Sequence, residues 1–325
     1  MFNNNIKEIS IKDIEGLSIG HEQDDEAKTG VSVLYFENGA QVGCDISGGG
    51  PASRETPLTS PLTADNPINA IVLSGGSAYG LAAADGVMRC LEKHDIGFDT
   101  GFAKVPLVCQ SCIFDLGYGR SDIRPDSDMG YKACSKALKF TDASMGNVGA
   151  GTGASVGKLL GMAQASKTGL GTYALELGDM KIAAVVVLNA FGDVFDFENA
   201  KKIAGLMNKE RTGFLDIEDM FVNIMNTPKN LFHANTTIGC IITNAAFDKA
   251  KLNKIAAMSG NAYARCISPV GTMADGDSIY AASIGKVEAD INLVGTLASR
   301  VMERAIKNAV TYAALSDEEY LKNCR

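Results

Sequence analysis

Residues 233–244 read HANTTIGCIITN, and within them the chain passes from a polar segment into an apolar run. From Thr237 to Thr243 the residues are mostly apolar or β-branched, which is the composition of a buried strand. We expect this strand to lie in the core of the fold. Thr236 then stands at its first residue, directly behind Asn235.

The junction between Asn235 and Thr236 allows two interpretations. In the simpler one the two residues only begin a strand, and on these residues alone it is the better interpretation. In the other, the chain cuts itself between them, and an internal threonine becomes a new N-terminus. Its hydroxyl is then a nucleophile and its own amine is the base. Evidence from the rest of the chain has to decide.

Size and composition indicate a globular chain of one large domain or two ordinary ones. With 325 residues, 46% of them hydrophobic and 21% charged, the chain can bury a substantial core. A formal charge of −8 argues against nucleic acid or an anionic membrane surface as a partner. Residues 1–14 form no basic, apolar signal, and the most apolar run, Ile182–Leu188, is too short to cross a bilayer. We expect a cytoplasmic protein.

Cysteine and histidine usage narrows the chemistry. The eight cysteines are scattered through apolar segments, which indicates free thiols in a reducing compartment. Cys109 and Cys112 form the one CxxC pair, and a structural zinc site would need a second pair. Only three histidines are present, so a Ser-His-Asp triad or a two-histidine metal site has few residues to draw on. A nucleophile whose base is not histidine is favoured, and we expect no metal or cofactor.

The most glycine-rich segment, residues 146–158, invites a nucleotide-binding interpretation but fits it poorly. Thr152 stands where a phosphate loop needs its first glycine, and Leu159 follows the lysine instead of Ser or Thr. A relaxed dinucleotide pattern begins at Gly149, but no clear strand precedes it. Lys158 is unusual because it lies in an apolar segment. A solvated lysine and a buried functional lysine both remain open at this point.

Two further polar sites could carry chemistry, one after a predicted core strand and one in a predicted loop. Asn189 comes directly after the apolar run Ile182–Leu188, where it could cap a turn or aim its amide into a cleft. Asp275 and Asp277 flank Gly276, which suggests a solvated turn or a calcium loop. The further ligands and the closing glutamate of an EF-hand are missing.

The order of predicted elements favours one mixed α/β domain, residues 1–325, in which helices cover two stacked sheets. Residues 30–37 and 40–46 are predicted to form a hairpin around Asn38-Gly39. We also expect strands at 69–74 and 279–284, helices near 81–91, 130–138, 248–265 and 287–315, and a polar excursion over 201–235 that is partly helical near 218–225.

Several of these segments together resemble one family, the L-aminopeptidase/D-esterases with the β-peptidyl aminopeptidases and the nylon-oligomer endo-hydrolases. The segments occur in the family's order and cover almost the whole chain. They are Gly48-Gly49-Gly50-Pro51 with Arg54-Glu55-Thr56, residues 73–81 (LSGGSAYGL) with Ala84-Asp85-Gly86, residues 146–158, Val187-Leu188-Asn189-Ala190, Asn235-Thr236-Thr237-Ile238, and Asp275-Gly276-Asp277. This joint match favours the self-cleavage interpretation.

The resemblance implies an αββα sandwich that is made as a precursor and cuts itself after Asn235. The products would be residues 1–235 and 236–325, held as one folded unit and assembled into a homotetramer. By position, Thr236 matches the nucleophile, and the residues around it in the nylon-hydrolase branch are matched by Lys158, Asn189, Asp275 and Asp277. Many aminopeptidase members use serine and lack the acid pair, and the family's Pro-Ile-Val-Pro reads Pro106-Leu107-Val108-Cys109 here. These departures affect which substrates the resemblance implies, and they leave the implied chemistry unchanged.

The implied chemistry agrees with general principles. A free α-amine has a pKa of about 7.7–8, so it can act as a base near neutral pH without histidine. We expect Lys158 to lower the pKa of that amine by like-charge repulsion. The amide of Asn189, with backbone amides, is the expected oxyanion donor, worth roughly 3–4 kcal/mol. The acid pair is expected to orient the hydroxyl and amine of Thr236 and to activate it before cleavage.

We therefore predict an autoprocessed aminopeptidase that releases N-terminal residues from short peptides, amides or esters through an acyl-enzyme on Thr236. Alternatives with the same nucleophile are an endo-hydrolase of amide oligomers and an acyltransferase. A nucleotide-binding module built on residues 149–158 ranks last.

Overall fold

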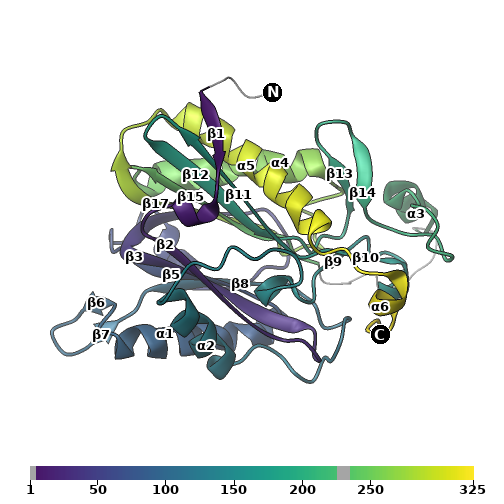
Figure 1. The fold of residues 1–325 in the computed structure, drawn as a ribbon, viewed down its shortest axis with the longest axis horizontal. Helices are drawn as coiled ribbons and strands as arrows, with labels where there is room; N and C mark the ends of the chain where they lie inside the picture. Colours follow the sequence, from purple (N-terminus) through teal and green to yellow (C-terminus); the bar gives the residue numbers. More distant parts are fainter. Residues whose placement is uncertain (1–4, 225–234) are drawn as a thin grey trace.

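The computed structural model describes residues 5–224 and 235–325. Ten strands run in the order β1-β11-β12-β15-β17-β3-β5-β8-β4, with β2 also paired to β3. The upper sheet in Figure 1 contains β1 (Ile6–Ile9), β11 (Leu170–Leu177), β12 (Met180–Val187), β15 (Ile238–Ala245), β17 (Ser278–Val287) and the second half of β3 (Thr29–Ile46). The lower sheet contains β2 (Leu17–Asp24), the first half of β3, β5 (Ile68–Ser74), β8 (Val108–Cys112) and β4 (Ala52–Arg54).

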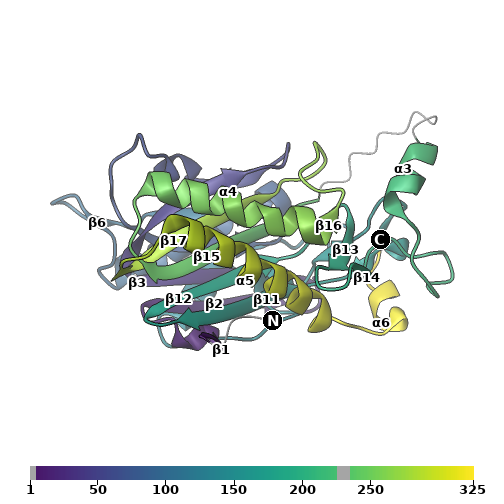
Figure 2. The same cartoon turned by 90° about the horizontal axis from the view of Figure 1, so that it is seen from above.

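Helices cover the outer face of each sheet, so the layers are helix, sheet, sheet, helix (Figure 1). The upper pair is α4 (Lys249–Cys266) and α5 (Ile291–Thr311), which lie side by side in Figure 2. The lower pair is α1 (Ala83–Lys93) and α2 (Ser127–Ala137). This is the αββα sandwich that the resemblance implied.

Shorter elements lie at the ends of the sheets. They are α3 (Ile217–Ile224), α6 (Asp317–Leu321), β6 (Phe98–Asp99), β7 (Lys104–Val105), β9 (Ser155–Val156), β10 (Ser166–Lys167), β13 (Asp193–Asp196), β14 (Lys201–Ala204), β16 (Ile267–Ser268), and the 3-10 turns Ile11–Asp13, Thr56–Thr59, Ser77–Ala82, Gly149–Gly151 and Met162–Gln164. The last part of the polar excursion, with His233 and Ala234, lies outside the described residues.

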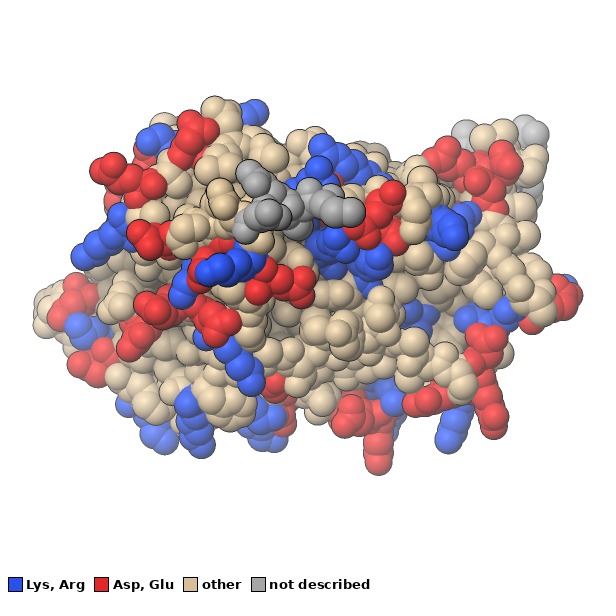
Figure 3. Space-filling model, turned by 45° about the horizontal axis from the view of Figure 1, so that its top comes forward, with Lys and Arg blue, Asp and Glu red and all other residues tan. Residues whose placement is uncertain are grey.

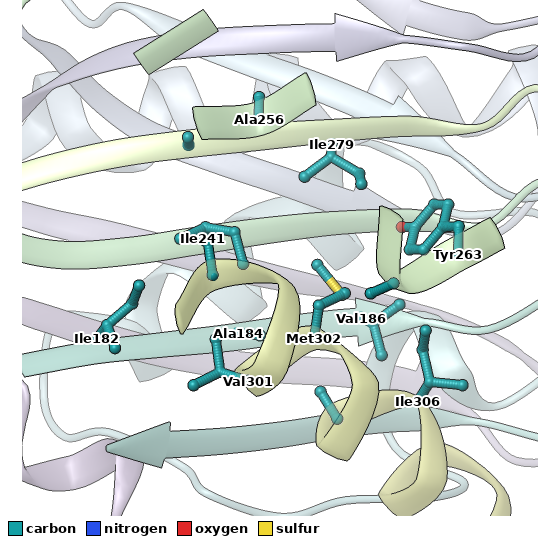
Figure 4. Close-up of a cluster of buried hydrophobic side chains, with 14 of the residues drawn as sticks. Ile182, Ala184, Val186, Ile241, Ala256, Tyr263, Ile279, Val301, Met302 and Ile306 are labelled. Carbon is teal, nitrogen blue, oxygen red and sulfur yellow. The ribbon is translucent and has the colours of Figure 1, made fainter. Parts of the chain in front are cut away.

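The central strand β15 is buried on both faces because helices pack above it and the second sheet below. Successive side chains of a strand point to opposite faces. Ile241 accordingly joins the cluster under α4 and α5, whereas its neighbours Cys240 and Ile242 join the cluster between the two sheets. Figure 4 shows the first cluster, in which Ile241 faces Val301 and Met302 of α5. A continuous apolar run is what such a position requires.

The predicted hairpin at Asn38-Gly39 is wrong. Residues 29–46 form the single strand β3, with an irregularity between Tyr35 and Ala40 where Gly39 adopts a positive φ of 71°. The first half of β3 pairs with β2 and β5, and the second half pairs with β17. The glycine thus lets one strand pass from the lower to the upper sheet, where the turn signal predicted a reversal.

Aspartates at the helix N-termini explain where the long helices begin. Asp248 accepts a hydrogen bond from the backbone N–H of Lys251, and Asp290 accepts from those of Asn292 and Leu293. Both satisfy N–H groups that have no partner within the helix. Within residues 5–224 and 235–325, no helix is long and apolar enough to cross a membrane.

Candidate active site

The sheet topology brings the predicted site residues together at one end of the central strands of the upper sheet. Strands β15 and β17 are parallel and begin side by side, with Ile238 opposite Ser278. The segments before them therefore also run together, and Asn235 forms a parallel bridge with Asp275. Strand β12 is antiparallel to β15 and ends there, with Val187 opposite Ile238. Asn189, two residues later, consequently lies beside the Asn235–Thr236 bond.

The bond between Asn235 and Thr236 is buried and tightly held in the uncut chain. Thr236 is 4% exposed, and its backbone N–H donates to the carbonyl oxygen of Asn189 at 3.0 Å. Its hydroxyl donates to the carbonyl oxygen of Asn235 itself. The nucleophile that the sequence predicts is therefore in contact with the carbonyl group that it would attack.

Lys158 is a buried lysine, so the structure answers the question that the sequence left open. It is 5% exposed, and its Nζ donates to the carbonyl oxygen of Asn189 at 3.2 Å and to Oδ1 of Asn189 at 2.9 Å. Burial lowers the pKa of Lys158 to about 7, against the opposing effect of nearby carboxylates, Asp275 foremost. The Asn189 carbonyl thus accepts from both Lys158 and the Thr236 nitrogen. A lysine with this pKa can exchange a proton near neutral pH.

The two aspartates are buried, and their hydrogen bonds hold backbone around the cut. Asp277 accepts from the N–H of Thr237 at 2.6 Å through Oδ1 and from Gly271 at 3.1 Å through Oδ2. Burial raises the pKa of Asp277 to about 7, and Asp275 adds to this effect. Asp275 accepts from the N–H of Phe191 at 3.2 Å and from the N–H and hydroxyl of Thr272 at 3.0 and 2.6 Å. An action of either carboxylate on the hydroxyl of Thr236 stays a prediction.

The amide of Asn189 has protein partners in the uncut chain. Its Nδ2 donates to the carbonyl oxygen of Phe114 at 3.0 Å, and its Oδ1 also accepts from the N–H of Ser155 at 3.1 Å. The predicted role of this amide as an oxyanion donor is not tested by this arrangement.

Two buried charged residues near the site, Asp115 and Lys167, belong to no motif of the sequence. Asp115 accepts from the hydroxyl of Thr29 and from the N–H of Gly76, both at 2.7 Å, and burial raises its pKa. Burial also lowers the pKa of Lys167 to about 7. Asp115 lies between Phe114 and Leu116 in no motif of the resemblance, and Lys167 has no sequence signal because its neighbours are polar.

A cavity of about 180 Å³ opens beside Lys158. It is lined by Phe114, Asp115, Gly117, Ser155, Lys158, Gly161, Met162 and Arg325. Apolar walls with one carboxylate and two basic groups can hold a small substrate that carries both a charged and an apolar part.

Four consecutive amides of the glycine-rich segment, at residues 149–152, already have partners within the protein. The N–H of Gly149 donates to Oε1 of Gln23, and the N–H of Ala150 donates to the hydroxyl of Ser32. The amides of Gly151 and Thr152 bond backbone carbonyls. Nor do His, Cys, Asp and Glu side chains gather in a group of three or more suited to a metal ion anywhere in the part of the chain that the structure describes. Figure 3 shows a face on which acidic and basic side chains are interspersed.

The chain is similar to known proteins over most of its length. The family model for peptidase family S58 matches residues 10–319. An uncharacterised aminopeptidase of Mycobacterium leprae is 36% identical over 305 residues, covering 86% of this chain and 80% of the relative. A 6-aminohexanoate-oligomer endohydrolase of Agromyces sp. is 30% identical over 316 residues, covering 91% and 84%.

Two solved structures share the fold. The β-aminopeptidase of a Burkholderia species superposes with a TM-score of 0.67 at 16% identity, covering 93% of this chain and 86% of that chain. The L-aminopeptidase D-Ala-esterase/amidase of Ochrobactrum anthropi, described as a variant of the Ntn (N-terminal-nucleophile) hydrolase fold, gives a TM-score of 0.65 at 15% identity, covering 94% and 86%.

Proposed function

This chain belongs to peptidase family S58, and on that premise we propose that it is a threonine-type aminopeptidase that generates its own nucleophile by cutting between Asn235 and Thr236. Membership of the family makes it a hydrolase of the N-terminal-nucleophile type. The identity of the nucleophile and the cut are our proposal. The observation that carries it is the hydrogen bond from the hydroxyl of Thr236 to the carbonyl oxygen of Asn235.

Self-cleavage proceeds in two steps. The Oγ1 of Thr236 attacks the carbonyl carbon of Asn235, the hydroxyl proton is removed, and the C–N bond breaks as the Thr236 nitrogen takes a proton. An ester between the two residues results, with the amine of Thr236 already free, and water hydrolyses it to a carboxylate on Asn235 and the hydroxyl of Thr236. Lys158 supports the proton transfer. Its Nζ and the Thr236 nitrogen both donate to the carbonyl oxygen of Asn189, so the two nitrogens lie close together, and the pKa of Lys158 of about 7 allows both protonation states.

Substrate hydrolysis then repeats the chemistry on an external amide. The free amine of Thr236 takes the proton of its own hydroxyl, and Oγ1 attacks the substrate carbonyl. The amine of the substrate then leaves with that proton. Water hydrolyses the resulting acyl-enzyme ester. The amide of Asn189 stabilises the oxyanion, which removes roughly 3–4 kcal/mol from the barrier. Asp275 and Asp277 hold the loop on which the nucleophile rests.

The substrates are short peptides or small amides with a free amine. Support comes from the aminopeptidase relatives and from the small cavity beside Lys158, where Asp115 can hold an ammonium group. The second candidate is an endo-hydrolase of amide oligomers, favoured by the match to the 6-aminohexanoate-oligomer endohydrolase. An acyltransferase would use the same acyl-enzyme and pass the acyl group to an amine.

We infer two properties of the working protein from the resemblance and the composition. Processed units assemble as homotetramers, which light scattering after size-exclusion chromatography tests. The protein works in the cytoplasm. In support of this, all eight cysteines lie in the described residues and are free thiols.

The experiment compares the purified protein with Thr236→Ala on amino-acyl p-nitroanilides, on their N-acetyl forms and on blocked amide oligomers. The proposal expects release of p-nitroaniline from the free-amine substrates and none by T236A. Preferential cutting of blocked oligomers supports the endo-hydrolase, and a new amide formed with an added amine supports the acyltransferase. Activity that survives in T236A contradicts all three.

A further inference from the structure

The carbonyl oxygen of Asn235 has a second hydrogen-bond donor besides the nucleophile. The backbone N–H of Gly276 donates to it at 2.7 Å. This oxygen becomes the oxyanion when Thr236 attacks its own peptide bond. A donor that is already in place strengthens its bond as negative charge develops, with no reorganisation of the site.

The peptide that carries this N–H is fixed on both sides by the glycine-rich loop 47–50. The N–H of Gly50 donates to the carbonyl oxygen of Asp275 at 2.8 Å, and the N–H groups of Ser47 and Gly48 donate to that of Asp277 at 3.1 and 3.2 Å. The N–H of Asn235 donates in turn to the carbonyl oxygen of Ala274 at 3.0 Å. The segment 274–276 therefore holds the residue before the cut at both its nitrogen and its oxygen.

Gly276 also lies where a side chain would displace the nucleophile. A Cβ at this position would stand 2.7 Å from Oγ1 of Thr236 and 2.7 Å from the carbonyl oxygen of Gly50. Both are closer than a carbon atom can approach. The absence of a side chain lets the hydroxyl and the N–H reach the same carbonyl.

We propose that the N–H of Gly276 is the oxyanion donor for self-cleavage, and that the amide of Asn189 serves only the later hydrolysis of substrates. In the uncut chain the Nδ2 of Asn189 donates to Phe114 and its Oδ1 accepts from Lys158 and Ser155. The same active site thus uses different donors for maturation and for turnover. This inference rests on the proposed self-cleavage.

The test follows newly made protein in a cell-free translation system with radiolabelled methionine, chased over time on denaturing gels. Gly276→Ala is expected to be cut at least about 100-fold more slowly than the parent, the effect typical of losing one oxyanion donor. The matched control is Gly213→Ala, because a Cβ at Gly213 meets nothing within 4 Å and the residue lies outside the site. G213A is expected to be cut like the parent. Hydroxylamine, which breaks an ester, should not speed the release of fragments from G276A, because formation of the ester is the slow step.

Asn189→Ala supplies an arm that does not depend on how G276A folds. It is expected to be cut within about threefold of the parent rate while losing about 100-fold or more in anilide hydrolysis. Limited proteolysis shows whether G276A is folded. Cutting of folded G276A within threefold of the parent overturns the inference, and so does an N189A chain that stays uncut. If G276A does not fold, N189A alone decides. A parent chain that stays whole overturns the proposed function itself, which is a separate outcome.

Discussion

Replacing Lys158 by methionine should remove from the stability of the protein a pH dependence of a specific direction. Methionine has a similar length and no charge, so K158M removes the buried ammonium and its two hydrogen bonds to Asn189. Both proteins are compared in the Thr236→Ala background, so that neither is cut. The quantity of interest is the difference in free energy of unfolding between the lysine and the methionine proteins.

The magnitude follows from the pKa of Lys158, which burial lowers from 10.5 to about 7. Between these values the unfolded chain holds a proton that the folded chain lacks, so the lysine protein gains stability as pH rises, by about 1.4 kcal/mol per pH unit. The full gain between pH 7 and 10.5 is on the order of 5 kcal/mol, and below pH 7 the difference is flat. Loss of the ammonium also raises the pKa of Asp277 further, which acts in the same direction.

Urea unfolding at pH 6, 7, 8 and 9 measures this difference. We expect the lysine protein to gain about 2–3 kcal/mol relative to K158M between pH 7 and 9. Lys167→Met is the matched comparison, because burial lowers the pKa of Lys167 to about 7 as well, and it should show the same slope. A difference that is constant with pH, or that falls as pH rises, would refute a pKa near 7 for Lys158.

Three further predictions concern the nucleophile, the acid pair and the packing. Thr236→Ser should be cut and active, whereas T236A should be neither; gels and anilide hydrolysis check both. Asp277→Asn should slow self-cleavage by at least about tenfold, because both carboxylate oxygens accept backbone N–H groups and an amide NH₂ would oppose one of them. The fraction cut over time measures this, and cutting of D277N at the parent rate contradicts it. Gly171→Ala should destabilise the protein by about 1–3 kcal/mol or more in urea unfolding, because a Cβ would stand 2.0 Å from the carbonyl oxygen of Ala305 and push β11 away from α5. An unchanged urea midpoint would contradict this prediction.

The layers of the fold could be predicted because the apolar runs are long and unambiguous. Strand β15 and helix α4 lie within one residue of the predicted ranges 237–243 and 248–265 at their starts, and each start has a local signal. The Asn38-Gly39 signal failed because it is purely local. Pairing of β3 with both β5 and β17 keeps the strand continuous, and no short-range rule includes those partners.

The candidate site could be predicted only through the resemblance. Asn235, Asn189 and Asp275 are far apart in the sequence, and the parallel pairing of β15 with β17 brings them together. The burial of Lys158 could not be decided from its neighbours alone. Asp115 and Gly276 matter because of where the fold places them, which the sequence does not indicate. Asp115 lines the cavity, and the N–H of Gly276 donates to the carbonyl oxygen of Asn235.

The most direct test of the account is the intact mass of the purified, active protein, with Edman sequencing of the shorter chain. The account predicts two chains of roughly 25 and 9 kDa, in proportion to residues 1–235 and 236–325, with Thr236 first in the shorter one. The T236A protein should give a single chain. An active preparation in which the Asn235–Thr236 bond is whole would contradict the central claim, because the threonine would then have no amine to act as its base.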